Sequence, residues 1–329
     1  MASRIVLFGM IALSFCGNAT ANESGVGRYH ADGPYTVTTA TLTVPSPNGA
    51  FVAIAYIPND ARRHPVVILS SGFMQMGVAY APYARRLASW GIVTVLRDDP
   101  SLAEALKASK SGQPGDLSRM DPAAIAETTV KTVSDVSYEV STWLPAANAD
   151  ANSPLHGMID ASRIGLAGHS RGAQIALLAG EEAPGRIKGV FGLDPVDSPF
   201  AASKAGAKLA SIGIPVAFIG ETVNSGKSSC APAGQNYQTL YDAATSPVVA
   251  ITAINADHTM FEDPANCLFC RFFCERGTAN PSAVLGYSVR YLTAFFAREL
   301  LGDASVGRAF EGAGVAADVA AGTIQIVSK

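Results

Sequence analysis

The sequence predicts an α/β fold in which a mostly parallel sheet is covered by helices on both faces. Short, mainly apolar runs such as residues 92–96 and 248–254 alternate with helical patterns along much of the chain. This alternation is typical of parallel strands buried on both faces. The composition agrees, because 329 residues with 48% hydrophobic and 16% charged residues suit a folded chain with a large core and exclude a disordered one.

The opening strands differ from the later ones. Residues 35–44 and 51–57 are rich in β-branched and aromatic residues and are joined by a turn at residues 45–49, so we expect antiparallel strands at one edge of the sheet. Further strands are expected at residues 64–69, 92–96, 163–167, 187–193, 215–219 and 248–254, and helices at residues 80–90, 121–144, 171–179 and 281–301. No repeat or linker divides the chain, which indicates one domain, centred on residues 28–310 with loose ends, without a large lid.

The N-terminus has the layout of a secretory signal peptide. A basic Arg4 precedes an apolar run at residues 5–15, and small residues end at Ala21, so residues 1–21 are expected to be removed. The apolar run of about 11 residues is shorter than the roughly 20 needed to span a bilayer, which disfavours a membrane anchor. We therefore expect residues 22–329 to be exported, to the periplasm or beyond, as one domain without a stable membrane anchor.

Five cysteines are present, and cleavage removes one of them, Cys16. A lipoprotein anchor at Cys16 is disfavoured because the large Phe15 precedes it. The four cysteines that remain are Cys230, Cys267, Cys270 and Cys274. Zinc sites usually show paired CxxC motifs, so in an oxidising compartment two disulfides are the better interpretation. Four cysteines allow three pairings, and the sequence does not choose among them.

The most informative motif lies between an expected strand and an expected helix. Gly168 and Gly172 flank Ser170 in a G-x-S-x-G pattern, which forms a nucleophile elbow when it joins a strand to a helix. The sharp turn leaves no room for larger side chains at the two glycines. Ser170 is therefore expected at the carboxyl edge of the sheet, where the following helix N-terminus favours developing negative charge.

A serine hydroxyl needs a base to act as a nucleophile, and the expected base is His258. It follows the strand expected at residues 248–254, so its loop lies at the same edge of the sheet as Ser170. The other histidines, which lie in the N-terminal tail, at a strand start, in a loop and inside the elbow, are His30, His64, His156 and His169. The side chain of His169 is expected to point away from the nucleophile.

Three acids lie between Ser170 and His258 in the chain order of the α/β-hydrolase plan. Asp194 directly follows a strand and is the first choice for orienting the histidine. Asp197 is expected to be a helix N-cap before Ser198 and Pro199, and Glu221, at the end of the next strand, is the alternative acid.

The oxyanion of the tetrahedral intermediate needs two backbone N–H donors. One is expected from Arg171, after the nucleophile, and the other from Phe73, where Gly72 gives the loop its backbone freedom. The Arg171 side chain is expected to pair with a nearby carboxylate. Apolar residues that would wall an acyl or alcohol site, or else belong to the core, are Phe73, Met74, Met76, Tyr80 and Tyr83.

With these residues the chain resembles the chlorophyllase family of α/β-hydrolases, which is related to polyester hydrolases and PAF-acetylhydrolases. The matching segments are residues 168–172, 192–197, 214–216, 219–220 and 230–232, Asn236, and the loop of Asp257 and His258 with Met260, Asp263 and the cysteines near 267–274. The resemblance implies a triad of Ser170, Asp194 and His258 without a metal or other cofactor. Two positions depart from the family, which usually has His-Gly-Phe where this chain has Ser71-Gly72-Phe73, and Gly where it has Asp257.

The expected function is that of an exported serine carboxylic-ester hydrolase acting through an acyl-enzyme on a small-molecule or lipid-like ester. Lipase or phospholipase activity and cutinase-like polyester hydrolysis use the same residues, and a non-catalytic binding protein on the same fold is an alternative of another class. A formal net charge of −3 gives no basic face for nucleic acid.

Overall fold

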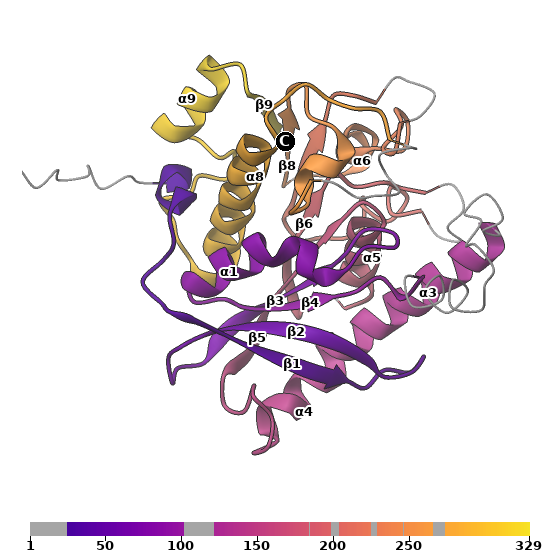
Figure 1. The fold of residues 1–329 in the computed structure, drawn as a ribbon, viewed down its shortest axis with the longest axis vertical. Coiled ribbons are helices and arrows are strands. Elements are labelled where there is room, and N and C mark those ends of the chain that lie inside the picture. Colours follow the sequence, from indigo (N-terminus) through magenta and orange to yellow (C-terminus); the bar gives the residue numbers. More distant parts are fainter. Residues whose placement is uncertain are drawn as a thin grey trace, which may run out of the picture.

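The computed structural model describes residues 25–101, 122–183, 185–198, 204–224, 229–245, 247–265 and 274–329. In these ranges nine strands form one sheet in the order β1-β2-β4-β3-β5-β6-β7-β8-β9 (Figure 1). The strands are β1 (Val37–Val44), β2 (Phe51–Pro58), β3 (His64–Ser70), β4 (Val93–Arg97), β5 (Ile159–His169), β6 (Ile187–Leu193), β7 (Val216–Glu221), β8 (Val248–Ala253) and β9 (Ile324–Ser328).

The helices lie between and around these strands. The longer ones are α1 (Ala81–Ser89), α3 (Pro122–Tyr138), α5 (Arg171–Glu182), α8 (Pro281–Phe296) and α9 (Ala313–Ala320). The shorter ones are η1 (Gly25–His30), η2 (Gly77–Tyr80), η4 (Glu139–Trp143), α4 (Leu144–Ala149), α6 (Tyr237–Ala243), η5 (His258–Phe261) and η6 (Ala297–Leu301). None of the helices in the described ranges combines the length and apolar character needed to cross a membrane.

The central strands β4, β3, β5, β6, β7 and β8 are parallel to one another, while the pairings of β1 with β2, β2 with β4 and β8 with β9 are antiparallel. Every residue of β3, β4 and β7 is buried, as expected for strands covered on both faces. This mostly parallel sheet with helices around it is an α/β-hydrolase fold, so the predicted fold class is confirmed.

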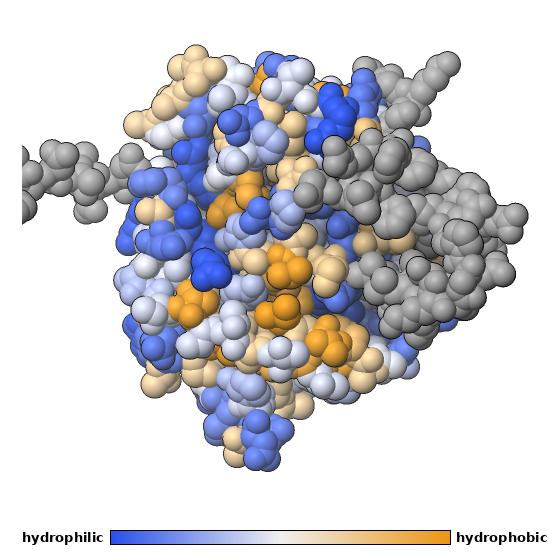
Figure 2. All heavy atoms as spheres, in the orientation of Figure 1, coloured by the Kyte–Doolittle hydropathy of each residue, from blue (hydrophilic) through white to orange (hydrophobic). Residues whose placement is uncertain are grey.

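The two faces of the sheet form two apolar cores. Along β3, Val67 and Leu69 pack into one core with residues of α1 and α8, whereas Val66 and Ile68 pack into the other with residues of α3, α5 and α6. This division follows from the alternation of side chains along a strand. Helices accordingly cover both faces in Figure 1. On the face shown in Figure 2, apolar residues lie in small groups between polar ones.

Two elements differ from expectation. The helix expected at residues 121–144 is divided by the π-helical segment η4, and residue 121 lies outside the described residues. The end expected to be loose instead contains α9 and β9, and β9 pairs antiparallel with β8 from Ile324 to Ser328. A five-residue strand of this kind carries little periodicity in sequence, and its place is set by the free edge of β8.

Candidate active site

Ser170 lies at the sharp turn between β5 and α5. Its backbone has φ 55° and ψ −123°, an unfavourable conformation for a residue with a side chain. A Cβ added to Gly168 would lie 2.2 Å from the carbonyl of Gly172, and one added to Gly172 would lie 2.2 Å from the carbonyl oxygen of Ser70. The elbow therefore requires glycine at both positions and presents Ser170 at the carboxyl end of β5.

His258 and Asp194 form a hydrogen-bonded pair beside this turn. His258 Nδ1 lies 2.6 Å from Asp194 Oδ2, and Asp194 is fully buried while His258 is 8% exposed. His258 is the first residue of η5, after β8, and Asp194 directly follows β6 with φ 37°. Ser170 adjoins the Asp194 loop, because its N–H donates to the carbonyl of Leu193 at 3.0 Å. Three loops at one edge of the sheet thus bring together Ser170, Asp194 and His258.

The other two acids take different positions. Glu221, at the end of β7, donates its backbone N–H to Asp194 Oδ1 at 3.1 Å. Burial, together with the nearby charge of Asp194, raises the pKa of the Glu221 carboxyl to about 9, so this side chain is neutral at neutral pH. Its carboxyl is not the partner of His258, which pairs with Asp194.

Asp197 accepts hydrogen bonds from a side chain of α5 and from backbone groups farther along the chain. Its carboxylate accepts hydrogen bonds from Gln174 Nε2 at 2.8 Å and from the N–H groups of Ala205 and Gly206 at 2.8 and 3.0 Å. Residues 199–203 lie outside the described residues. Asp197 therefore satisfies backbone donors farther along the chain, while the residues that it was expected to cap lie outside the described part, so the N-cap stays a prediction.

The loop after β3 holds Phe73 between two anchored neighbours. The N–H of Gly72 donates to the Tyr80 hydroxyl at 3.1 Å, and the N–H of Met74 donates to Asp99 Oδ1 at 3.2 Å. In the described part of the chain, neither the Phe73 N–H nor the Arg171 N–H at the start of α5 donates to a protein acceptor. Both donors therefore remain available for a ligand oxygen.

One carboxylate connects the segments that carry these donors. The guanidinium of Arg171 pairs with Asp99 Oδ2 and donates to Ser101 Oγ at 3.1 Å, as its expected pairing with a carboxylate implies. The Arg171 Cζ also lies 4.9 Å from the centre of the Phe73 ring. Asp99, which follows β4, was missed by sequence reasoning, although its place after a parallel strand put it at the correct edge.

Two of the residues considered for a substrate wall belong to the core. Tyr80 and Tyr83 are fully buried, because they pack against the sheet at the start of α1. Phe73 and Met74 are partly exposed, and Met76 is 52% exposed. The part of the predicted wall that can meet a ligand is therefore the loop after β3.

His169 contacts the histidine of this pair. Its ring packs against that of His258, with 4.6 Å between the ring centres. Its nitrogens lie within hydrogen-bond distance of the Tyr80 hydroxyl and the His258 carbonyl. His169, inside the elbow, therefore links the Ser170 turn to the His258 loop.

A disulfide and a buried aspartate anchor the segment that follows the His258 loop. Cys230 and Cys274 are bonded, with their Cα atoms 5.1 Å apart. Asp257 accepts hydrogen bonds from the N–H groups of Thr259 at 3.0 Å and Gly277 at 2.8 Å. The other two disulfide candidates, Cys267 and Cys270, lie outside the described residues. Among the described residues, no cluster of three His, Cys, Asp or Glu side chains is arranged to hold a metal.

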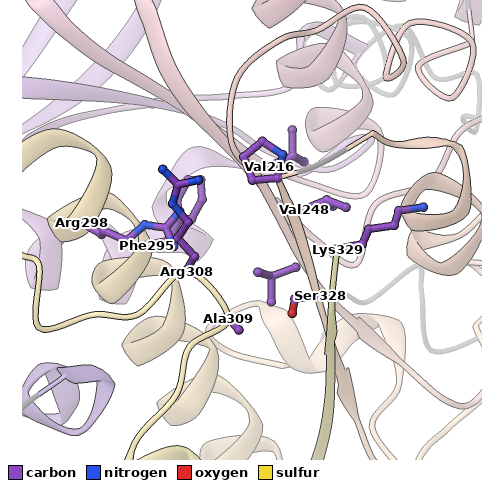
Figure 3. Close-up of a pocket in the computed structure, with 10 residues that line it drawn as sticks. Val216, Val248, Phe295, Arg298, Arg308, Ala309, Ser328 and Lys329 are labelled. Carbon is purple, nitrogen blue, oxygen red and sulfur yellow. The ribbon is translucent and has the colours of Figure 1, made fainter.

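A cavity of about 180 Å³ lies at the amino ends of the parallel strands (Figure 3). Its lining includes Val216 and Val248, the first residues of β7 and β8. Because the strands are parallel, their amino ends lie away from the loops that carry Ser170, Asp194 and His258. This cavity is therefore separate from the candidate active site.

Comparison with known proteins identifies the family of the chain. A search of curated proteins gives no match. The family model described as Chlorophyllase matches residues 117–309, which is more than half of the chain and includes the Ser170, Asp194 and His258 loops. The loop containing Phe73 lies outside the matched residues. On this match, the chain belongs to the chlorophyllase family of α/β-hydrolases.

Proposed function

We propose that the protein is an exported serine carboxylic-ester hydrolase in which Ser170 is the nucleophile, His258 the general base and Asp194 the acid of the triad. The observation that carries the proposal is the 2.6 Å hydrogen bond between His258 Nδ1 and Asp194 Oδ2 beside a serine held at φ 55°. Membership of a hydrolase family supports the reaction class. Residues 22–329 would form one catalytic domain.

The hydrogen bond to Asp194 decides which nitrogen of His258 acts as the base. A carboxylate accepts only, so Nδ1 carries the proton and Nε2 is left to accept one from Ser170. The serine oxygen then attacks the ester carbonyl, and the negative charge develops on the carbonyl oxygen. The N–H groups of Phe73 and Arg171 are proposed to donate to this oxyanion.

Collapse of the tetrahedral intermediate breaks the ester bond. His258 returns the proton to the leaving alcohol, and the acyl group remains on Ser170. A water molecule then repeats the sequence, with His258 as its base, and releases the acid. Asp194 stabilises the imidazolium in both halves of the reaction, a role that the neutral side chain of Glu221 does not fill.

Export is proposed from the N-terminal sequence pattern together with the disulfide. Residues 1–21 have the layout of a cleavable signal peptide. The Cys230–Cys274 bond supports an oxidising compartment, where such bonds persist. The substrate is proposed to be a small-molecule or lipid-like ester.

Hydrolysis of p-nitrophenyl esters of increasing acyl length tests the proposal. Ser170→Ala and His258→Ala are each expected to lower kcat/KM by at least about a thousandfold, because either change removes a member of the triad. His156→Ala is the matched control, since His156 is an exposed loop residue and its loss should leave the rate unchanged. Activity that survives in both triad variants would contradict the mechanism.

A further inference from the structure

Three buried polar side chains next to the proposed triad take no part in the mechanism above. Tyr80 is fully buried, His169 is 1% exposed and Glu262 is 3% exposed. Burying polar groups in a core is unfavourable unless they are hydrogen-bonded. These side chains nevertheless lie where the loop after β3, the elbow and the His258 loop meet, which suggests a role beyond packing.

Hydrogen-bond chemistry fixes the direction of most contacts in this cluster. His169 Nε2 lies 3.1 Å from the carbonyl oxygen of His258, and because a carbonyl only accepts, Nε2 is the donor. In the neutral ring Nδ1 is then an acceptor, and it takes the proton of the Tyr80 hydroxyl at 2.8 Å. The Tyr80 oxygen in turn accepts the Gly72 N–H at 3.1 Å.

These contacts form one chain of three hydrogen bonds, all in the same sense, from Gly72 through Tyr80 and His169 to the backbone of His258. Burial raises the pKa of Tyr80 well above its usual value, so its hydroxyl keeps the proton that the chain requires. Glu262 Oε1 lies 3.3 Å from His169 Nδ1 and 3.5 Å from the Tyr80 hydroxyl, so it is a second acceptor beside the middle bond. The two outer bonds, from Gly72 and to His258, do not involve Glu262.

The chain touches three of the segments that the mechanism needs, and the Asp194 loop is not one of them. Gly72 directly precedes Phe73, His169 directly precedes Ser170, and the last acceptor belongs to His258 itself. The packing is close, since a Cβ on Gly72 would lie 2.9 Å from His169 Nδ1 and 3.5 Å from Ser170 Cβ. The rings of His169 and His258 lie 4.6 Å apart and add a stacking contact to the hydrogen bonds.

We propose that Tyr80 and His169 are positioning residues that hold the oxyanion loop, the nucleophile turn and the His258 loop in one reactive geometry. The inference rests on the proposed function, because it assigns no new reaction. Neither side chain needs to touch substrate. Their effect comes from fixing the N–H of Phe73 and the ring of His258 relative to Ser170, and displacements of about 1 Å in such arrangements are enough to lower rates substantially.

Tyr80→Phe tests the chain, because it removes one oxygen and keeps the ring. We expect kcat for a p-nitrophenyl ester to fall about tenfold while KM changes less than about twofold. Affinity for a trifluoromethyl ketone, which mimics the tetrahedral intermediate, should fall by about the same factor as kcat.

Tyr83→Phe is the matched control. Tyr83 is equally buried, lies nearby and donates to the carbonyl of Phe261 at 3.0 Å, but among the described residues no hydrogen bond joins it to Gly72 or His169. It should lose thermal stability to a similar extent and keep kcat within about twofold. If Tyr80→Phe keeps the wild-type kcat, or if Tyr83→Phe loses as much kcat as Tyr80→Phe, the inference is wrong.

Substitution of His169 gives a second test in the same assay. His169→Gln keeps an N–H that can reach the His258 carbonyl and should retain more kcat than His169→Phe, which has none; equal kcat in the two would count against the chain. Wild-type protein that hydrolyses no ester and does not react with a fluorophosphonate would overturn the proposed function itself. An active wild type with indistinguishable Tyr80 and Tyr83 variants would overturn only the positioning role.

Discussion

The two ends of the parallel strands, here called the carboxyl edge and the amino edge of the sheet, carry different kinds of residues. At the carboxyl edge, after β3, β5, β6 and β8, lie four of the five non-glycine residues with positive φ in the described part of the chain: Met74, Ser170, Asp194 and Asn255. At the amino edge, the cavity of Figure 3 is lined by the starts of β7 and β8 and by Phe295 of α8, together with the polar side chains of Arg298, Arg308, Ser328 and Lys329. Val216, Val248 and Phe295 there are buried apolar side chains at 3%, 1% and 1% exposure.

This difference separates the end of the sheet that carries the proposed site from the end that contributes to stability. Positive φ at non-glycine residues and buried charges such as Asp194 and Asp99 are unfavourable in isolation, and both are concentrated at the carboxyl edge. The apolar cores on the two faces of the sheet must offset them. Changes at the carboxyl edge are therefore expected to alter rate more than stability, and apolar changes at the amino edge to alter stability alone.

The largest effect is expected from Asp194→Asn. The amide donates as well as accepts, so His258 loses the partner that selects its tautomer, and kcat should fall about 10³- to 10⁴-fold. Steady-state hydrolysis of a p-nitrophenyl ester measures it. Glu221→Gln is the matched control at the next strand end and should keep kcat within about tenfold, because Glu221 is already neutral. A larger loss in the Glu221 variant would reverse the assignment of the acid.

A smaller effect on kcat is expected from Asp99→Asn. The amide oxygen can still accept from Met74, but the charge that holds Arg171 is lost, so the two proposed oxyanion donors are less well fixed. We expect kcat to fall about tenfold to a hundredfold, with KM little changed. Steady-state kinetics and the affinity for a trifluoromethyl ketone should show the same factor.

Val248→Ala provides the amino-edge counterpart to the Asp99 variant. It removes two methyl groups from a residue that is 1% exposed and should lower the free energy of unfolding by about 1–3 kcal/mol without changing kcat. Urea unfolding and ester hydrolysis on the same sample decide the point. A loss of kcat comparable to that of Asp99→Asn would break the distinction between the edges.

Removing the disulfide should affect stability more than rate. The bond joins residues 44 positions apart, and the double variant Cys230→Ser/Cys274→Ser is expected to lower the free energy of unfolding by about 2–4 kcal/mol. Thermal unfolding with and without reductant measures the loss. An unchanged melting temperature in both the variant and the reduced wild type would show that the bond contributes nothing.

The smallest effect is expected in the pH dependence of the free energy of unfolding, and it comes from the raised pKa of Glu221. Folded Glu221 keeps its proton up to about pH 9, whereas its ordinary pKa is 4.5. The folded state therefore binds more protons than the unfolded state between these values, and the free energy of unfolding falls as pH rises through that window. Glu221→Gln should show a shallower fall. Glu139, whose pKa burial raises to about 7, is present in both the wild type and the Glu221 variant. If their curves of unfolding free energy against pH are parallel, Glu221 does not contribute to the fall.

Much of the fold follows from local patterns in the sequence. The apolar runs that alternate with helices correspond to β3 through β8, because buried parallel strands must be apolar on both faces. The strand β9 was not predicted, since its residues pair with β8 about 75 positions earlier, as in the match of Val249 with Ser328. Such long-range pairing leaves almost no trace in a five-residue segment.

The candidate site likewise contains residues that could be predicted from the sequence and residues that could not. Ser170, Asp194 and His258 were accessible to sequence reasoning because each follows an expected strand, and parallel strands end at one edge. Asp99, Tyr80 and Glu262 were not, because their importance lies in contacts made by folding: the Tyr80 hydroxyl and the Glu262 carboxylate meet across 182 positions of chain. Sequence order identifies the residues that carry chemistry more readily than those that hold them in place.

The central claim is that Ser170 is the nucleophile of an ester hydrolase, and covalent labelling tests it most directly. The protein should be incubated with a fluorophosphonate ester, digested and examined by mass spectrometry. We expect a single adduct on the peptide that contains Ser170, with labelling slowed in Asp194→Asn and absent in Ser170→Ala. An adduct on another residue, or an unlabelled wild-type protein that still hydrolyses esters, would contradict it.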